Sequence, residues 1–395
     1  MKKLLLLSFL IFLPLMASAD AVEIDGIYYN LVKKAKIAEV TENPNHYLGE
    51  INIPEKVTYE DTEYAVTSIG DYAFAGAEFG KIVIPGSVET IGKWSFGKCY
   101  ELTSITLPEG LVSIGEQAFY DDSKLISIVL PDSLKEIGNR AFESCTNLTS
   151  ITIGTNLESI GNDAFSQCEM LSTINISDIS SWCQISFKDN PLRYAHTLSL
   201  NGKVIKDLVI PEGVDRINKR AFIDYTNLQS ISFPISLHSI GYEAFQNCTN
   251  LTKLSLPDNV ESLDVRAFSG CISLSSVTLG SGVNTIEQEA FGSCKELSEV
   301  YCYAEKVPFG TDINAFVDSY INYATLYVPE NSIAAYKEKS PWKDFKEILP
   351  LKGTKIDSIT LDSDDKSVYY NLKGQMVDNP QKGLFIRNNK KIVIK

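Results

Sequence analysis

Residue types that could do chemistry are scarce in this chain and poorly spaced. Its 395 residues include three histidines, which are His46, His196 and His238. No two of them stand at the spacing of a metal site, and the sequence contains neither a nucleophile elbow nor a phosphate-binding loop. We therefore predict that the protein is not an enzyme and that it has no catalytic residues, metal or cofactor.

Carboxylates are the one abundant reactive group, with 50 Asp and Glu residues. A pair of carboxylates could hydrolyse a glycoside. Most of these acids, however, are expected at turns, as Glu109 and Asp132 are, and a solvated corner is the simpler interpretation. Asp362, Asp364 and Asp365 lack the glycine-turned loop of a calcium site. The acids therefore predict neither a hydrolase nor a metal site.

Cysteine recurs with a regular spacing. Six of the eight cysteines lie three residues after a repeated phenylalanine: Cys99, Cys145, Cys168, Cys248, Cys271 and Cys294. Neighbours such as Cys145 and Cys168 could be bridged in an oxidising compartment, yet a free cysteine is also a good small core residue. Cys302 is expected at an inward strand position. We favour a reduced, buried ladder, and disulfides between adjacent coils are the alternative.

These cysteines belong to a repeat that fills most of the chain. A dipeptide that ends in phenylalanine, mostly Ala-Phe, returns along the chain. Its phenylalanines are Phe74, Phe96, Phe119, Phe142, Phe165, Phe222, Phe245, Phe268, Phe291 and Phe316. The pairs stand 22 to 25 residues apart, except for one gap of 57 residues. Such a period indicates stacked repeats. Because one coil cannot bury its own apolar face, the coils must stack and the end coils need caps.

One coil shows the unit most clearly. Residues 102–107 alternate apolar and polar side chains up to Pro108, which predicts a short strand that ends at a corner. Residues 112–114 predict a second strand, and residues 116–123 a helical turn. Gly115 indicates either positive φ or a close backbone approach. The predicted fold class is a β-rich repeat solenoid with coils of about 23 residues, capped at both ends.

Outward positions of the first strand offer a flat surface. One column contains Lys81, Ser104, Ser127, Ser150, Thr173, Asp207, Ser230, Lys253, Ser276 and Glu299. A second column beside it runs from Val83 to Tyr301. The surface is rich in hydroxyl groups and lacks long aromatic platforms for sugars. It could bind an extended protein through many weak contacts, although Ser and Thr also simply suit strands.

The 57-residue gap places an insertion around residues 177–206. It carries an aromatic and polar set, which is Trp182, Cys183, Phe187, Tyr194 and His196. These side chains could form a binding site, since loops often carry function. Packing of the rings against the solenoid is the favoured interpretation.

The ends of the chain are not repeats. Lys2 and Lys3 precede an apolar run that ends at Ala17-Ser18-Ala19, which predicts a secretory signal peptide over residues 1–19, cleaved between Ala19 and Asp20. The other predicted segments are an N-terminal β cap (20–66), the solenoid (67–300), a C-terminal cap (301–350), an acidic linker (351–367) and a basic β module (368–395).

Charge is strongly acidic but unevenly distributed. The net charge is −14, which makes nucleic acid an unfavourable partner. Residues 366–395, in contrast, contain seven basic residues and one acidic residue. This tail could dock on another protein or a membrane surface, or it could pair with the last coil. We expect a monomer that contacts a membrane only through a possible C-terminal anchor.

The coil pattern Leu-x-x-Ile-x-Leu-Pro-x-x-Val-x-x-Ile-Gly-x-x-Ala-Phe-x-x-Cys-x-x-Leu resembles the BspA-like class of leucine-rich repeat over roughly residues 65–350. That class is found in surface and secreted proteins of Gram-negative anaerobes. The tail, with Tyr370-Asn371-Leu372-Lys373-Gly374-Gln375 and Lys382-Gly383-Leu384-Phe385-Ile386, is similar to the end of C-terminal sorting domains that an outer-membrane secretion route recognises.

The resemblance implies adhesin-like binding to host matrix proteins or to other bacteria. We therefore expect a secreted or cell-surface binding protein, with the periplasm as another possible location, that serves adhesion or protein interaction. A structural spacer and a glycan-binding protein are the alternatives.

Overall fold

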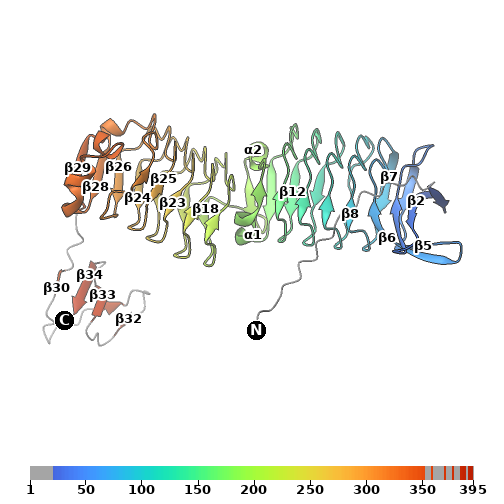
Figure 1. The fold of residues 1–395 in the computed structure, drawn as a ribbon, viewed down its shortest axis with the longest axis horizontal. Helices are drawn as coiled ribbons and strands as arrows, with labels where there is room; N and C mark the ends of the chain where they lie inside the picture. The colour runs from blue at the N-terminus through green and yellow to red at the C-terminus, as the bar shows by residue number, and fades with distance from the viewer. Residues whose placement is uncertain are drawn as a thin grey trace.

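The computed structural model describes residues 21–351 and the backbone of five short strands between residues 357 and 394. The predicted signal peptide, its cleavage site at Ala19 and Asp20, most of the acidic linker and the side chains of the basic module lie outside the described residues. Residues 21–351 form an elongated β-solenoid of about 12 turns with a spacing near 23 residues (Figure 1). The repeat solenoid predicted from the sequence is confirmed.

The N-terminal end is a small set of mainly antiparallel strands. These are β1 (Val22–Ile24), β2 (Ile27–Val32), β3 (Ile37–Val40), β4 (Leu48–Asn52), β5 (Lys56–Tyr59) and β6 (Thr62–Ile69). Strands β1, β2 and β3 pair in sequence, and β3 pairs in parallel with β6. Since β6 then pairs in parallel with β8 of the next coil, this end covers the first coil of the stack.

Most coils contribute two short strands, one to each of two separate faces of parallel strands. The first-strand face is formed by β7 (Glu78–Val83), β10 (Ser127–Val129), β12 (Ser150–Ile153), β14 (Thr173–Ile176), β16 (Leu198–Leu200), β18 (Asp207–Val209), β20 (Ser230–Ser232), β22 (Lys253–Ser255), β24 (Ser276–Leu279), β26 (Glu299–Cys302), β28 (Thr325–Val328) and β29 (Glu347–Pro350). The second-strand face is formed by β8 (Thr90–Ile91), β9 (Ser113–Ile114), β11 (Glu136–Ile137), β13 (Ser159–Ile160), β15 (Ser186–Phe187), β19 (Arg216–Ile217), β21 (Ser239–Ile240), β23 (Ser262–Leu263), β25 (Thr285–Ile286) and β27 (Gly310–Thr311). The corners that carry proline form one rim of the solenoid, and the Ala-Phe turns form the other, which we call the turn face.

Stacked phenylalanines fill the core behind the turn face. Phe96 and Phe119 lie 5.0 Å apart between ring centroids, with their planes within 2° of parallel. The same arrangement continues from coil to coil on both sides of the insertion, as for Phe245 and Phe268 at 5.2 Å. These rings are almost completely buried. Because each ring contacts the ring of the next coil, the coils stabilise one another through apolar burial and ring stacking.

Two details of the predicted coil are wrong. Residues 102–107 do not form a strand, although the equivalent residues of most other coils do. Ile105 is only half-buried there, and this segment is joined to the next coil by one described backbone bond, in which Ile126 N donates to Thr103 O. Residues 116–123 lie mostly in consecutive hydrogen-bonded turns and do not form the predicted helical turn. The second strand is confirmed as β9.

The glycine after the second strand is needed for a close backbone approach. A Cβ on Gly115 would lie 2.7 Å from the carbonyl carbon of Gly92, and one on Gly138 would lie 2.6 Å from that of Gly115. Positive φ occurs elsewhere in the coil, at the residue that precedes the Ala-Phe pair, such as Gln117. Asp264 and Glu287 show that later coils accept a side chain at the glycine position.

The insertion and the C-terminal end carry the short helices. The insertion contains α1 (Ile179–Gln184) on the corner rim and α2 (Leu192–Ala195) on the turn face, and β16 folds back into β17 (Lys203–Val204). The C-terminal end contains η1 (Ile321–Tyr323), η2 (Glu330–Ser332), α3 (Ile333–Tyr336) and η3 (Trp342–Asp344). Buried Trp342 packs edge-on against Phe316 at 5.7 Å and so covers the last phenylalanine of the stack.

Backbone strands are also described in the tail. They are β30 (Asp357–Ser358), β31 (Tyr369–Tyr370), β32 (Met376–Val377), β33 (Gly383–Arg387) and β34 (Lys390–Ile394). They form one sheet in the order β30, β34, β33, β31 and β32, in which β33 and β34 are an antiparallel pair.

Candidate binding groove at the insertion

The aromatic set of the insertion packs inward. Trp182, Cys183 and Phe187 are almost fully buried, Tyr194 is half-buried and His196 is exposed. The rings of Trp182 and Phe187 contact each other at 4.9 Å. The packing interpretation is therefore confirmed for Trp182 and Phe187, whose buried rings are not available to a ligand.

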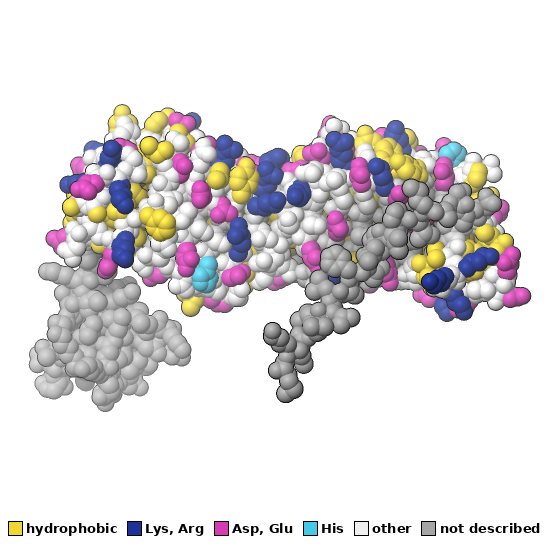
Figure 2. Space-filling model, in the orientation of Figure 1, with side chains coloured by type: hydrophobic (Ala, Val, Ile, Leu, Met, Phe, Trp, Pro, Cys, Tyr) yellow, Lys and Arg dark blue, Asp and Glu magenta, His cyan; other side chains and the backbone are white. Residues whose placement is uncertain are grey.

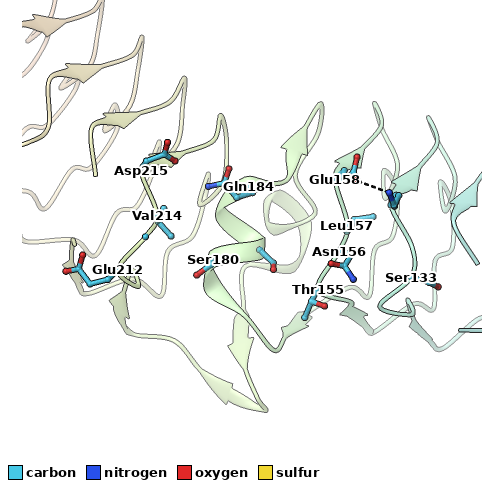
Figure 3. A pocket seen from close by; sticks show the side chains of 13 residues that line it. Ser133, Thr155, Asn156, Leu157, Glu158, Ser180, Gln184, Glu212, Val214 and Asp215 are labelled. Carbon is cyan, nitrogen blue, oxygen red and sulfur yellow. Dashed lines mark ion pairs between the residues drawn. The ribbon is translucent and has the colours of Figure 1, made fainter. Parts of the chain in front are cut away.

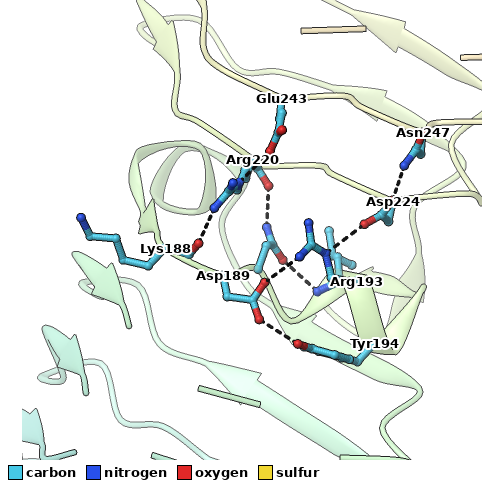
Figure 4. A network of polar contacts seen from close by, with 10 residues as sticks. Lys188, Asp189, Arg193, Tyr194, Arg220, Asp224, Glu243 and Asn247 are labelled. Carbon is cyan, nitrogen blue, oxygen red and sulfur yellow. Dashed lines mark hydrogen bonds and ion pairs between the residues drawn. The ribbon is translucent and has the colours of Figure 1, made fainter. Parts of the chain in front are cut away.

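A network of polar contacts fixes the insertion to the coil that follows it (Figure 4). The Arg193 guanidinium lies between two carboxylates, with Nη1 3.5 Å from Asp189 Oδ1 and Nε 3.4 Å from Asp224 Oδ2. Tyr194 donates its hydroxyl hydrogen to Asp189 Oδ2 at 2.9 Å. Burial and the nearby Asp189 carboxylate raise the pKa of Tyr194 to about 12, so this hydroxyl remains a donor. The network gives α2 a fixed place on the turn face.

Both strand ladders stop at the insertion. On the second-strand face β15 ends one sheet and β19 begins the next, and on the first-strand face β17 and β18 are the corresponding edges. Helix α1 occupies the corner rim between these sheets. Asp178 caps the N-terminus of the helix, because its Oδ2 accepts from Ser181 N at 2.6 Å. Gln184, the last residue of the helix, donates from Nε2 to the carbonyl oxygen of Arg216 at 3.2 Å. The end of the helix is therefore held to the coil that follows it, where Asn218 Nδ2 also donates to Gln184 O.

An open groove of about 870 Å³ lies across α1 on this rim (Figure 3). One wall is lined by Ser133, Lys135 and residues 155–158, α1 forms the floor, and residues 212–215 line the other wall. Figure 3 shows Glu158 and Glu212 on opposite sides, with Gln184 and Ser180 between them. Between neighbouring coils in register the corners stack directly, as when Glu158 N donates to Lys135 O at 2.8 Å.

The groove is polar and acidic. Its walls present the carboxylates of Glu158, Glu212 and Asp215 against one ammonium group, that of Lys135, which lies 3.4 Å from Glu158 Oε1. Hydroxyl and amide groups, such as those of Ser180 and Gln184, complete the lining. Such a surface offers many hydrogen-bond acceptors and a net negative charge to a ligand that carries N–H groups or positive charge.

Sequence reasoning missed this groove. Ser133 and Asp215 stand far apart in the chain and become neighbours only because α1 replaces an ordinary corner. The usable signal was the same 57-residue gap that located the insertion, since an interrupted stack must leave two unlike coils facing each other.

The predicted first-strand surface is present but interrupted. Ser127 and Ser150 stand in register on adjacent strands, as do Lys253 and Ser276. The second column contains exposed apolar side chains, of which Val129 and Val209 are 62% and 64% exposed. The column does contain a short aromatic platform at its C-terminal end, because Tyr301 and Tyr327 stack at 4.6 Å.

The predicted cysteine ladder is reduced and buried. All eight cysteines are free and buried. The thiols of the repeat donate to the phenylalanine carbonyl of the preceding coil, as Cys145 Sγ does to Phe119 O at 3.1 Å. Burial raises the pKa of each thiol, to about 12 for Cys168 and Cys294. These groups therefore serve the core and are poor nucleophiles or metal ligands in the folded protein.

The described part of the chain offers little else for chemistry. Within residues 21–351, no group of three or more His, Cys, Asp and Glu residues is placed to hold a metal ion. His46, His196 and His238 are exposed and belong to separate coils or loops. Across the same residues, no helix has the length and apolar character that crossing a bilayer requires.

The ladders, the coil period and the aromatic core define a β-solenoid of the leucine-rich repeat class. A family model described as a BspA type leucine rich repeat region matches residues 67–193 and 199–321 in six copies. The chain belongs to this BspA-type leucine-rich repeat family. A comparison with curated proteins finds no match.

Solved structures with similar chains are leucine-rich repeat proteins. One, from Bacteroides ovatus, is 27% identical with a TM-score of 0.31, over 71% of this chain and 94% of that one. A leucine rich cell surface protein from Faecalibacterium prausnitzii is 23% identical with a TM-score of 0.37, over 86% and 96% of the chains. The pneumococcal vaccine antigen PcpA is 16% identical with a TM-score of 0.41, over 84% and 99%.

Proposed function

We propose that this protein is a secreted or cell-surface binding protein that holds a protein partner in the groove beside α1, as a scaffold for adhesion or protein interaction. The single observation that supports this site is the groove of about 870 Å³ at the insertion, where both ladders stop. Membership of a family of repeat scaffolds and the scarcity of chemical groups favour binding over catalysis.

The lining favours a partner segment that carries Lys or Arg side chains. Glu212 and Asp215 are exposed on one wall, and Glu158 stands on the other. An extended segment along the groove would place cationic groups within reach of both walls. Because the attraction is between partly solvated charges, the affinity should fall as salt rises above the physiological range.

Export supports this proposal from the sequence side. The predicted signal peptide at residues 1–19 would send the chain out of the cytoplasm, and the tail resembles a sorting domain. Fractionation of the native organism, with intact mass of the protein from each fraction, tests this. Surface recovery without the tail is expected, and periplasmic recovery with Lys395 intact would contradict sorting by that route.

The groove is tested with charge reversal and a matched control. The variant Glu212→Lys with Asp215→Lys changes one wall. The control Asp258→Lys with Glu261→Lys changes the equivalent corner positions two coils further on, outside the groove. The pairs match closely, because Glu212 accepts from Ile235 N and Asp258 accepts from Ser281 N of the next coil. Binding of the full mature chain to immobilised host matrix proteins and to whole bacterial cells is measured for both.

We expect the groove variant to lose at least tenfold in affinity and the control to remain within twofold. A third variant, Ser127→Lys with Ser150→Lys, reports on the first-strand face. Loss of binding in this variant alone would move the site to that face. If the unmodified protein bound none of these surfaces, the adhesion proposal would be wrong and the spacer alternative would be favoured.

A further inference from the structure

The chain leaves the solenoid on the rim that carries the groove. Strand β29 pairs with β28 so that Pro350 stands opposite Val328, and Leu351 N donates to Val328 O at 2.8 Å. Leu351 therefore stands in the corner column, in register with Pro329. Because α1 and the groove occupy this same rim, the chain beyond Leu351 starts from the rim of the groove.

The distance from this exit to the groove is within reach of the linker. Pro211, next to the groove residue Glu212, occupies the same corner column. It lies about six coils before Leu351, which is ~29 Å at ~4.8 Å per coil. Residues 352–365 could span up to about 46 Å when extended, and their r.m.s. length as a flexible chain is on the order of 20 Å. Residues 366–395 can therefore reach the groove of their own chain, at an effective concentration of about millimolar.

The groove presents carboxylates without a basic partner in the described part of the chain. Within residues 21–351, the pair of Lys135 and Glu158 is the one ion pair that involves a groove carboxylate. Glu212 and Asp215 on the opposite wall are exposed. Figure 2 shows that Asp and Glu side chains recur along this lower edge of the solenoid. Because two walls face each other across α1, a cationic segment in the groove can contact carboxylates on both sides.

The C-terminal tail has the complementary charge. Residues 366–395 contain seven basic residues and one acidic residue, while the chain as a whole has a net charge of −14. The backbone of Arg387 pairs with that of Lys390, and the backbone of Ile386 pairs with that of Lys391. This register brings three basic residues to one end of the β33–β34 pair. Such a concentration of positive charge matches an acidic surface.

We propose that residues 366–395 occupy the groove of the same chain and compete there with an external partner. The basic end of the β33–β34 pair then lies between Glu158 on one wall and Glu212 and Asp215 on the other, where charge-assisted hydrogen bonds can form. The proposal rests on the proposed function of the groove as a site for cationic segments, and it adds an internal competitor. Such a competitor lowers the apparent affinity for a partner in proportion to the fraction of molecules whose groove is open. Removal of the tail during export would then activate the site.

Carbodiimide cross-linking of the full mature chain, with its tail intact, tests the contact directly. The reagent activates a carboxylate, which an amine in contact with it attacks, so that an amide forms and the carbodiimide leaves as a urea. The joined peptides of the monomer are identified by mass spectrometry. We expect Lys390 or Lys391 to be joined to Glu212 or Asp215, and we expect the yield to fall in 1 M salt, which screens such contacts.

The matched control lies within the same chain. Asp258 and Glu261 occupy the equivalent corner positions two coils after Glu212 and Asp215, outside the groove. They are closer than the groove to the exit at Leu351, so a tail that meets acidic side chains at random should be joined to them at least as often. We expect no cross-link between the tail and these two residues.

A charge exchange tests whether opposite charges hold the contact. The groove variant Glu212→Lys with Asp215→Lys and the tail variant Lys390→Glu with Lys391→Glu each remove a reacting group, so both should lose the cross-link. The informative protein combines the four substitutions and carries the charges in exchanged positions. We expect the cross-link between the tail and positions 212 and 215 to return in this protein, after circular dichroism has shown that it is folded.

Three results would overturn the proposal. The first is that the monomer of the unmodified chain gives no cross-link between tail and groove. The second is a cross-link in the covalent dimer alone, which would assign the contact to the tail of a second copy. The third is equal cross-linking of the tail to Asp258 and Glu261.

Failure of this proposal and failure of the proposed function give different results. Partner binding is measured separately, before and after a protease cuts the linker. A groove variant that loses partner binding, together with an intact chain that gives no cross-link, would keep the groove as a binding site and remove the tail from it. A cross-link in a protein that binds no partner, even after the linker is cut, would support the tail contact and contradict the proposed function.

Discussion

Trp182 Nε1 donates a hydrogen bond of 2.8 Å to the carbonyl oxygen of Ala221, across 39 residues of sequence. The same oxygen accepts from Asn190 Nδ2 at 3.1 Å. Ala221 belongs to the first Ala-Phe pair after the insertion, so these bonds join the insertion directly to the core turn of the second half. Because both strand ladders stop at the insertion, these side chains replace the ladder contacts that connect ordinary coils.

Loss of the Trp182 ring should uncouple the unfolding of the solenoid half before the insertion from that of the half after it. The side chain is 1% exposed, and truncation of a buried Trp costs about 3–5 kcal/mol. In a repeat protein, stability depends on the interfaces between neighbouring units, so a weak interface divides the cooperative unit. We expect Trp182→Ala to convert one urea unfolding transition into two, measured by circular dichroism. Trp342→Ala, which affects the C-terminal end, should lower stability without splitting the transition at the middle. A single transition in Trp182→Ala would show that the halves are coupled by other contacts.

Asp122 should make the folded protein more stable in mild acid. It stands in the cysteine position of its coil and is fully buried; Oδ1 accepts from Cys99 N at 2.8 Å, while Oδ2 has no partner. Burial raises the pKa of this carboxyl well above its ordinary value. A proton on Oδ2 would let the acid donate to the carbonyl of Phe96, as the cysteines of sister coils do to theirs.

The sign of the pH effect follows from that shift. Because the folded-state pKa is raised, the contribution is fully present below the unfolded pKa, near 4, and is lost as pH rises toward the folded pKa, by up to about 1.4 kcal/mol per pH unit. We expect Asp122→Asn, which stays neutral and keeps both hydrogen bonds, to be more stable than the unmodified protein at pH 7 and to differ little from it at pH 4. Urea unfolding at the two pH values measures this. An Asp122→Asn variant that is less stable at pH 7 would show that the carboxylate is charged and paired.

The cysteine thiols should react with a thiol reagent in the unfolded protein but not in the folded protein. All eight cysteines are buried and free, and burial raises their pKa. With Ellman's reagent at pH 8, we expect essentially no reaction of the native protein and eight thiols after unfolding in guanidinium without reductant. Fewer than eight would mean that some coils are bridged in the exported protein. Rapid reaction of the native protein would contradict the buried ladder.

The sequence predicted features that recur, and missed those that depend on the interruption of the repeat. Phe119 and Cys145 were identified as core residues because the phenylalanine returns in ten copies of the repeat and the cysteine in six of them, at one spacing. The groove between Ser133 and Asp215 could not be found in this way, since it forms where unlike coils meet. The sequence left positive φ and a close backbone approach open at Gly115; the structure has the close approach there and positive φ at Gln117, because the turn is set by its backbone bonds, as when Gln117 N donates to Asn139 O. The strand at residues 102–107 was wrong for a similar reason: the apolar pattern marks which side chains face inward, but not whether the neighbouring backbone is close enough to pair.

The glycine after the second strand gives a direct test of how closely the first coils stack. A Cβ at residue 138 would lie 2.6 Å from the carbonyl carbon of Gly115 and 2.6 Å from Glu116 N. Both atoms are backbone, so relief requires the coils to separate and weakens the core contacts of both. We expect Gly138→Ala to lower the free energy of unfolding by about 1–3 kcal/mol, the usual cost of overpacking.

The matched control is Glu287→Ala, at the equivalent position of a later coil that already accepts a Cβ. We expect this variant to differ from the unmodified protein by less than about 0.5 kcal/mol, as exposed substitutions usually do. Both variants are compared by urea unfolding under the same conditions. Equal stability of the two variants would mean that the first coils can separate freely at this position, and that the glycine is retained for a reason other than close approach.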